Sequence, residues 1–202
     1  NDPDVNVRAE AARILNLFVQ LGELDEIPEN VHRKVEDGLL ISVTSEDDAR
    51  VRRAALESLG FSSRPEVDTL IESSFHREDP AWQASALIAM GRSIDDRWAE
   101  DVTRSLVSEN DNIRKAAVQA AGELSLKSVR PLLLKMLGEE EDDTVLSAVI
   151  WSLSQIGGED VRTYLENLLD QIEDDEQIAF LEEALDNLAF TDRKSTRLNS
   201  SH

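Results

Sequence analysis

One helical phrase recurs along this chain at a nearly fixed interval. The segments Val51–Gly60, Trp82–Gly91 and Ile113–Gly122 align without gaps, and their first residues lie 31 positions apart. A period of this size is typical of a solenoid, in which each unit buries its apolar face only against its neighbours. The repetition therefore predicts an all-α protein, a right-handed α-solenoid of about five to six helix-turn-helix repeats. Weaker copies of the phrase begin at Val7, Val145 and Gln177.

Each copy reads as a first helix, a tight turn and a second helix that contains the recurring phrase. Acidic residues such as Asp48 and Asp142 precede the second helices, where carboxylates accept hydrogen bonds from the free N–H groups of the first turn. The second helices are expected to end at Gly60, Gly91 and Gly122, because glycine commonly terminates helices. The first helices are predicted at residues 29–43, 65–75, 96–107, 128–137 and 159–172.

The phrase resembles the HEAT repeat, in particular its short bacterial form of about 31 residues, which also occurs in bilin-lyase-like proteins. The residues that carry the resemblance are an acidic turn, a Val-Arg or equivalent pair and a pair of small residues, as in Asp48–Ala55, Asn110–Ala117 and Asp2–Ala12. The resemblance covers residues 1–190. It implies a solenoid whose second helices line a concave surface.

The two ends of the chain depart from the pattern. The sequence starts at Asn1, at the second helix of a truncated repeat, and is interpreted as a fragment of a longer protein. Residues 1–190 are predicted to form the solenoid, and residues 191–202 an unstructured tail. The string from Arg193 to His202 is similar to a read-through translation of sequencing-adapter DNA, so it is interpreted as non-native. A genuine basic tail is the alternative.

A net charge of −21, from 42 acidic and 21 basic residues, restricts the possible partners. Such a field repels phosphate backbones and anionic membrane surfaces, and it favours a protein partner, possibly a basic one. Adaptation to high salt is an equally good explanation of the acidity. The chain lacks the run of ~18–20 apolar residues that spans a bilayer. It also lacks cysteine, which suits a cytoplasmic protein. The oligomeric state stays open.

Catalytic and metal-binding patterns are absent from the sequence. The three histidines, His32, His76 and His202, are scattered, and they form neither an adjacent His-Glu pair nor a His-x-x-x-His spacing. The acidic runs at residues 139–143 and 173–176 lack the spacing of a calcium loop and are interpreted as helix caps. We therefore predict no catalytic, cofactor-binding or metal-binding residue, no cofactor, and a chain that is not an enzyme.

Three arginines, Arg8, Arg52 and Arg114, follow the first residue of their copies. The resemblance to HEAT repeats implies that they pair with an acid of the adjacent turn and form a ladder that joins successive repeats. A role in binding is the alternative. Gln83, Leu146 and Ile178 replace the arginine in the other copies, where the ladder is expected to fail.

Four residues are candidates for contact with a partner. Trp151 and Ile88 occupy the position held by Glu57 and Gln119 in other copies, which is expected to face outward from the second helix. Tryptophan is also over-represented at interface hot spots. Burial of Trp151 against a neighbouring repeat is the alternative. Arg53 and Lys115 follow the ladder arginines and are expected to be exposed.

These observations predict a non-catalytic scaffold that binds a protein on its concave face or acidic edge. Two alternatives stay open. One is a bilin-lyase-like enzyme or enzyme accessory, which rests on the family resemblance. The other is a purely structural spacer in a larger protein.

Overall fold

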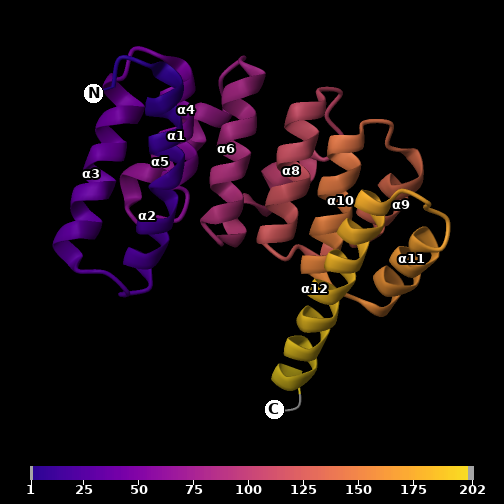
Figure 1. Ribbon diagram of the computed structural model, residues 1–202. Helices are drawn as coiled ribbons and strands as arrows, with labels where there is room; N and C mark the ends of the chain where they lie inside the picture. The colour runs from indigo at the N-terminus through magenta and orange to yellow at the C-terminus, as the bar shows by residue number, and fades with distance from the viewer. Residues whose placement is uncertain (1, 200–202) are drawn as a thin grey trace. The chain divides into compact units, whose positions relative to one another are not determined.

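The computed structural model describes residues 2–199, and every regular element in that range is a helix (Figure 1). The chain divides into two compact units, with the boundary between Trp98 and Ala99. The predicted first helices correspond to α3, α5, η1 with α7, η2 with α9, and α11 in the bounds given below. The periodic sequence therefore specifies the helical class and the alternation of helices.

Unit 1 contains three second helices and two first helices. The second helix of the first copy is divided by Leu15 into α1 and α2. Helix α4 packs against both α1 and α6, and it also contacts α3 and α5, so it lies at the centre of the unit. The elements are α1 (Val5–Ile14), α2 (Asn16–Glu23), α3 (Glu29–Ser45), α4 (Ala49–Leu59), α5 (Pro65–Phe75), α6 (Pro80–Arg92) and the 3₁₀ helix η1 (Asp96–Trp98).

Unit 2 repeats this arrangement around α10. Figure 1 shows α8, α10 and α12 as successive neighbours, and α9 and α11 pack against the same helices. The largest fully buried side chains of this unit are leucines such as Leu133, Leu153 and Leu181, which come from both sets of helices. The elements are α7 (Ala99–Ser105), α8 (Asp111–Glu123), η2 (Lys127–Val129), α9 (Arg130–Glu139), α10 (Asp143–Ile156), α11 (Glu159–Leu169) and α12 (Asp175–Asn199).

The acidic turns cap the second helices. The Asp48 carboxylate accepts a hydrogen bond from the Arg50 N–H at 2.8 Å, and Asp142 accepts from both Thr144 and Val145. Hydrogen bonds from Arg50, first from its side chain and then from its backbone, lower the pKa of Asp48 to about 2. The acidic runs are therefore engaged locally by backbone N–H groups that a helix leaves free.

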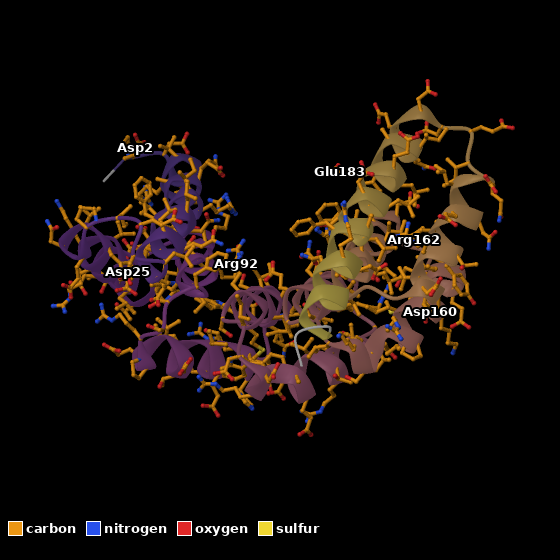
Figure 2. The ribbon with its side chains drawn as sticks, turned by 90° about the horizontal axis from the view of Figure 1, so that it is seen from below. Asp2, Asp25, Arg92, Asp160, Arg162 and Glu183 are labelled. Carbon is orange, nitrogen blue, oxygen red and sulfur yellow. The ribbon has the colours of Figure 1, made fainter. Side chains whose placement is uncertain are left out.

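The glycines of the phrase do not end their helices through a left-handed conformation. Gly60 has a φ of −54°, and Gly91 and Gly122 lie inside α6 and α8. The left-handed residues other than glycine are Asp25, labelled in Figure 2, together with Ile94 and Ser125. They close the turns after α2, α6 and α8.

Close helix packing explains the glycines at two of these positions. A Cβ atom on Gly60 would lie 2.8 Å from the Ala89 backbone, and one on Gly122 would lie 2.9 Å from the Ser152 Cα. Both distances are shorter than real Cβ contacts allow, so only glycine permits these approaches.

Replacing Ile94 with glycine should stabilise the protein by about 0.5–1 kcal/mol. A β-branched residue in the left-handed region is strained by roughly 1–2 kcal/mol, and replacement by glycine relieves this strain. The greater conformational freedom of glycine in the unfolded chain offsets part of the stabilisation. Little burial is lost, because Ile94 is 74% exposed. Thermal and urea denaturation would measure the change. Ile94→Asn should stabilise as well, and a lower melting temperature for both variants would contradict the assigned strain.

The expected unstructured tail is not what the structure shows at residues 191–199. Helix α12 continues through Asn199, and residues 200–202 lie outside the described residues. The physical reason is that α12 contains no glycine or proline to interrupt it. Asp192 also accepts a hydrogen bond from the Gly158 N–H at 3.2 Å and pairs with Arg162 at 3.5 Å. The region after residue 190 therefore contributes contacts to unit 2.

Candidate functional site

A groove of about 450 Å³ lies on the second helices of unit 2. Trp151 and Phe180 line it, and their ring centroids are 6.5 Å apart with their planes inclined by 29°. Both aromatic side chains are half-buried, so each keeps part of its surface available. The remaining lining residues are Lys115 and Gln119 of α8 and Asp143, Thr144, Ser147 and Ala148 of α10.

Phe180 is the residue that gives this groove its aromatic character. It stands fourth in its copy, where the preceding four copies have Ala54, Ser85, Ala116 and Ala148. Those small residues allow helices to approach closely, whereas a phenylalanine projects from α12 towards the α10 tryptophan. The exchange of a small residue for a large one creates an apolar surface with a polar rim, which is the usual composition of a binding groove.

The structure brings two of the four partner candidates together. Lys115 and Trp151 line the same groove, on α8 and α10. Arg53 on α4 and Ile88 on α6 belong to unit 1 and do not line this groove. Both side chains are half-buried, so each keeps part of its surface exposed. A role for these two residues stays a prediction. Phe180 is the contributor that sequence reasoning missed.

A larger hollow of about 620 Å³ opens elsewhere on unit 2, beside Arg114. Both basic residues that line it are already paired. Arg114 binds Asp111 at 2.8 Å as well as Glu140, and Lys135 lies 3.3 Å from Glu139. A ligand would have to compete with these pairs, so the aromatic groove is the better candidate for binding.

Arg8 and Arg114 each reach an acid in the next acidic turn. The Arg8 guanidinium lies 3.1 Å from the Glu46 carboxylate. The Arg114 guanidinium donates hydrogen bonds to both carboxylate oxygens of Glu140, at 2.6 and 2.7 Å. These hydrogen bonds lower the pKa of Glu46 and of Glu140. Since the Glu140 side chain is only 7% exposed, the bidentate pair is the stronger of the two links.

Arg52 departs from this arrangement, and the expected ladder contact is wrong at this position. Its guanidinium lies 5.5 Å from the centre of the Trp82 ring, and Arg77 lies 4.0 Å from that ring. Within the part of the chain that the structure describes, the buried Arg52 Nε has no hydrogen-bond partner. The reason is that Arg77 stands two residues before the cap Asp79, where the other turns have Glu46 and Glu140, so this turn offers Arg52 a second cation instead of a carboxylate. Both arginines lie against the Trp82 ring instead.

Unit 1 contains a polar cluster formed by Glu23, His32 and Glu36, which we call the Glu–His–Glu cluster. The His32 Nε2 lies 3.5 Å from a Glu36 oxygen and 3.9 Å from a Glu23 oxygen. All three ligand-type atoms lie within 4.8 Å of one another. The Glu36 carboxylate is buried and accepts a hydrogen bond from the Ser62 hydroxyl. Glu36 is buried, His32 is half-buried and Glu23 is exposed, so the cluster runs from the interior of unit 1 to its surface and consists of groups that can bind a cation.

Part of this cluster could have been found from the sequence. His32 and Glu36 are four residues apart on one helix, a spacing that places two side chains on the same face. Neither an adjacent His-Glu pair nor a His-x-x-x-His spacing is present, so the sequence patterns predict no metal ligand. Glu23 gave no such signal, because it reaches the cluster through the turn between α2 and α3, which no periodicity describes.

The family of the chain follows from comparison with known proteins. Residues 67–146 and 99–186 match the family described as HEAT repeats, and together these matches span more than half of the chain. The chain belongs to the HEAT-repeat family. The matched residues include α6 and α8, which hold two of the three clear copies of the helical phrase, and α10, which holds a weaker one.

A solved structure supports the same fold for this HEAT-repeat chain. A crystal structure of an engineered protein, a target of the Northeast Structural Genomics Consortium, is similar to it with a TM-score of 0.52 and 16% identity. The similarity covers 95% of this chain and 94% of the engineered one. A search among curated proteins gave no significant match. The HEAT repeats therefore form an α-solenoid, and their partner has to be argued from the surface.

The helices also bear on the relation to membranes. Among the described residues, none of the helices combines the length and the apolar character that a bilayer-spanning segment needs.

Proposed function

We propose that this HEAT-repeat chain is a protein-binding scaffold, and that the groove lined by Trp151 and Phe180 receives an apolar side chain of the partner. The observation that carries the proposal is the pair of half-buried aromatic rings on neighbouring second helices. Partly exposed tryptophan in a concave, mainly apolar setting is the residue type that most often dominates binding energy.

The charge of the chain suggests the rest of the partner's chemistry. With 42 acidic residues against 21 basic ones, the protein attracts cations over its surface. Asp143 lines the groove, and Asp175 and Glu176 lie in the first turn of α12, which carries Phe180. We therefore propose a partner segment that carries a large apolar or aromatic side chain flanked by lysine or arginine.

The alternatives have less support. The HEAT-repeat match covers the repeats alone and gives no support to a link with bilin attachment. A spacer needs no particular surface, so it does not account for the exchange of a small residue for Phe180. A protein-binding scaffold accounts for both the fold and the departure from the repeat at Phe180.

Selection from a displayed peptide library would test the proposal. Peptides with an apolar anchor and basic flanks should be enriched, and Trp151→Ala should weaken their binding by about 30-fold, which corresponds to roughly 2 kcal/mol at a hot spot. Fluorescence anisotropy with a selected peptide would measure the affinity. Tyr164→Ala is the matched control, since it removes a 53% exposed aromatic side chain from a first helix of the same unit.

Two results would argue against the groove. If both variants bind the selected peptides as tightly as the original protein, the binding surface lies elsewhere. If the library yields no enriched sequence, the result would support the alternative that the chain is a purely structural spacer. Affinity that falls with added salt would support the basic flanks, whereas affinity independent of salt would favour acidity as an adaptation to high salt.

A further inference from the structure

The distances in the Glu–His–Glu cluster do not fit hydrogen bonds. The His32 Nε2 is 3.5 Å from Glu36 and 3.9 Å from Glu23, whereas a charge-assisted N–H···O bond measures about 2.7–2.9 Å. Two ligands of one tetrahedral cation lie about 3.4 Å apart when each bond is about 2.1 Å long. The spacing of the cluster is therefore closer to that of ligands around a shared ion.

The imidazole also has an unused atom. Among the described residues, the buried His32 Nε2 has no hydrogen-bond partner. The ring is held in place by close packing on Gly22, where a Cβ atom would lie 2.1 Å from the ring. A buried ring nitrogen without a partner is uncommon, and here it faces two carboxylates. The ring nitrogen therefore lies between two carboxylates without a hydrogen bond to either.

The carboxylates are held by groups that resemble the outer shell of a metal site. Glu23 accepts hydrogen bonds from the Ser63 N–H at 2.9 Å and from its hydroxyl at 3.2 Å, and Glu36 accepts one from Ser62. Such contacts orient ligand oxygens and are a regular part of protein metal sites.

Arg64 is the basic side chain that lies beside the cluster, and its guanidinium pairs more closely with two acids outside the cluster. Its guanidinium lies 4.0 Å from Glu36 but 2.7 Å from Asp37 and 2.9 Å from Glu66. The two carboxylates of the cluster therefore carry more negative charge than the arginine compensates. A bound cation would supply the missing positive charge.

We propose that Glu23, His32 and Glu36 form a binding site for one divalent cation of the Zn²⁺ type. An imidazole nitrogen with two carboxylate oxygens suits Zn²⁺, whereas Ca²⁺ prefers six to eight oxygen ligands. The ligands come from the end of α2 and from α3, so the ion would fasten the turn between these helices. The fourth position is open to water.

Titration of the full chain, first freed of metal with a chelator, would test the site. Calorimetry with ZnCl₂ should show saturable binding of one ion, and Co²⁺ should give the intense visible absorption of a tetrahedral site. His32→Gln and Glu23→Gln should each weaken Zn²⁺ binding by at least about 100-fold, since even outer-shell changes cost about 10–100-fold. His76→Gln, at an exposed histidine of the same unit, should leave the affinity unchanged.

Circular dichroism separates loss of the site from loss of the fold. Glu23→Gln serves here because the Glu23 side chain keeps 27% of its surface exposed and its replacement should leave the helices intact. Wild-type protein that binds no Zn²⁺, or a folded Glu23→Gln variant that binds it as tightly as wild type, would overturn the proposal. The site is independent of the aromatic groove, so peptide binding has no bearing on this result.

Discussion

Replacing Gly122 with leucine should destabilise unit 2 by about 3 kcal/mol, near the upper end of the cost of overpacking. Gly122 lies where α8 meets α10, and even a Cβ atom there would come within 2.9 Å of the Ser152 Cα and 2.4 Å of the Gln155 side chain. The Gln155 side chain can move aside, but the α10 backbone cannot do so without separating the helices. The Ser152 hydroxyl, which bonds the Val118 carbonyl at 2.8 Å, would be displaced as well.

Gly138→Leu is the matched control for this experiment. Gly138 lies in α9 of the same unit, and a Cβ atom there would have no neighbour within 4 Å. Because glycine in a helix costs about 1 kcal/mol relative to good helix formers, this variant should be neutral or slightly more stable. Urea denaturation of both proteins would give the difference. Equal changes for the two variants would show that the approach of α8 and α10 does not depend on Gly122.

Replacing Arg114 with methionine should cost about 2–3 kcal/mol. Breaking a fully buried ion pair costs about 3–5 kcal/mol, and the 16% exposure of the Arg114 side chain reduces that figure. Methionine keeps the length of the side chain while leaving the buried Glu140 carboxylate without its bidentate partner. Arg104→Met is the control, since that arginine is 65% exposed and its ion pairs should contribute about 0.5 kcal/mol or less.

The same substitution should change how stability depends on pH. The hydrogen bond from Arg114 lowers the pKa of Glu140 below its usual value of 4.5. A carboxyl group with a lowered pKa in the folded state adds stability above its unfolded pKa, and this stability is lost as the pH falls through the folded value. The stability gap between wild type and Arg114→Met should therefore narrow below about pH 4.5.

A double variant tests the origin of the cost. Arg114→Met combined with Glu140→Leu should recover most of the lost stability, because an apolar pair removes the unpaired buried charge. No recovery, together with a gap that stays constant in acid, would show that packing of the arginine stem matters more than the ion pair.

The repeat explains which parts of the fold could be predicted from sequence. Apolar positions that recur at helical spacing locate the helices, and acidic residues before them mark the caps that Asp48 and Asp142 provide. The glycines of the helical phrase lie at or near the ends of the second helices as expected, but the expected reason, helix termination by glycine, is wrong. Whether a glycine serves a left-handed turn or a close contact depends on the neighbouring helix, as Gly60 and Ala89 show.

The sites were less predictable, because each arises where one copy departs from the others. Phe180 among small residues and Trp82 in place of valine or isoleucine are visible in the aligned copies, but their contacts with Trp151 and Arg52 depend on adjacent helices. Glu23 reaches His32 across a turn outside the repeat pattern. A periodic sequence describes the average repeat, whereas binding surfaces come from its exceptions.

Small residues on the second helices allow close packing, and the spacing of these helices determines how a partner that lies across them can contact successive repeats. Ala116, Ala117 and Gly122 of α8 are buried, α8 packs against α10, and packed helices generally lie about 8–10 Å apart. An extended peptide advances about 3.3 Å per residue, so three residues cover one helix spacing. Successive side chains of a strand point to opposite faces, so residues three apart in a strand-like partner would not both face unit 2. The side-chain period of such a partner would therefore differ from the spacing of the second helices.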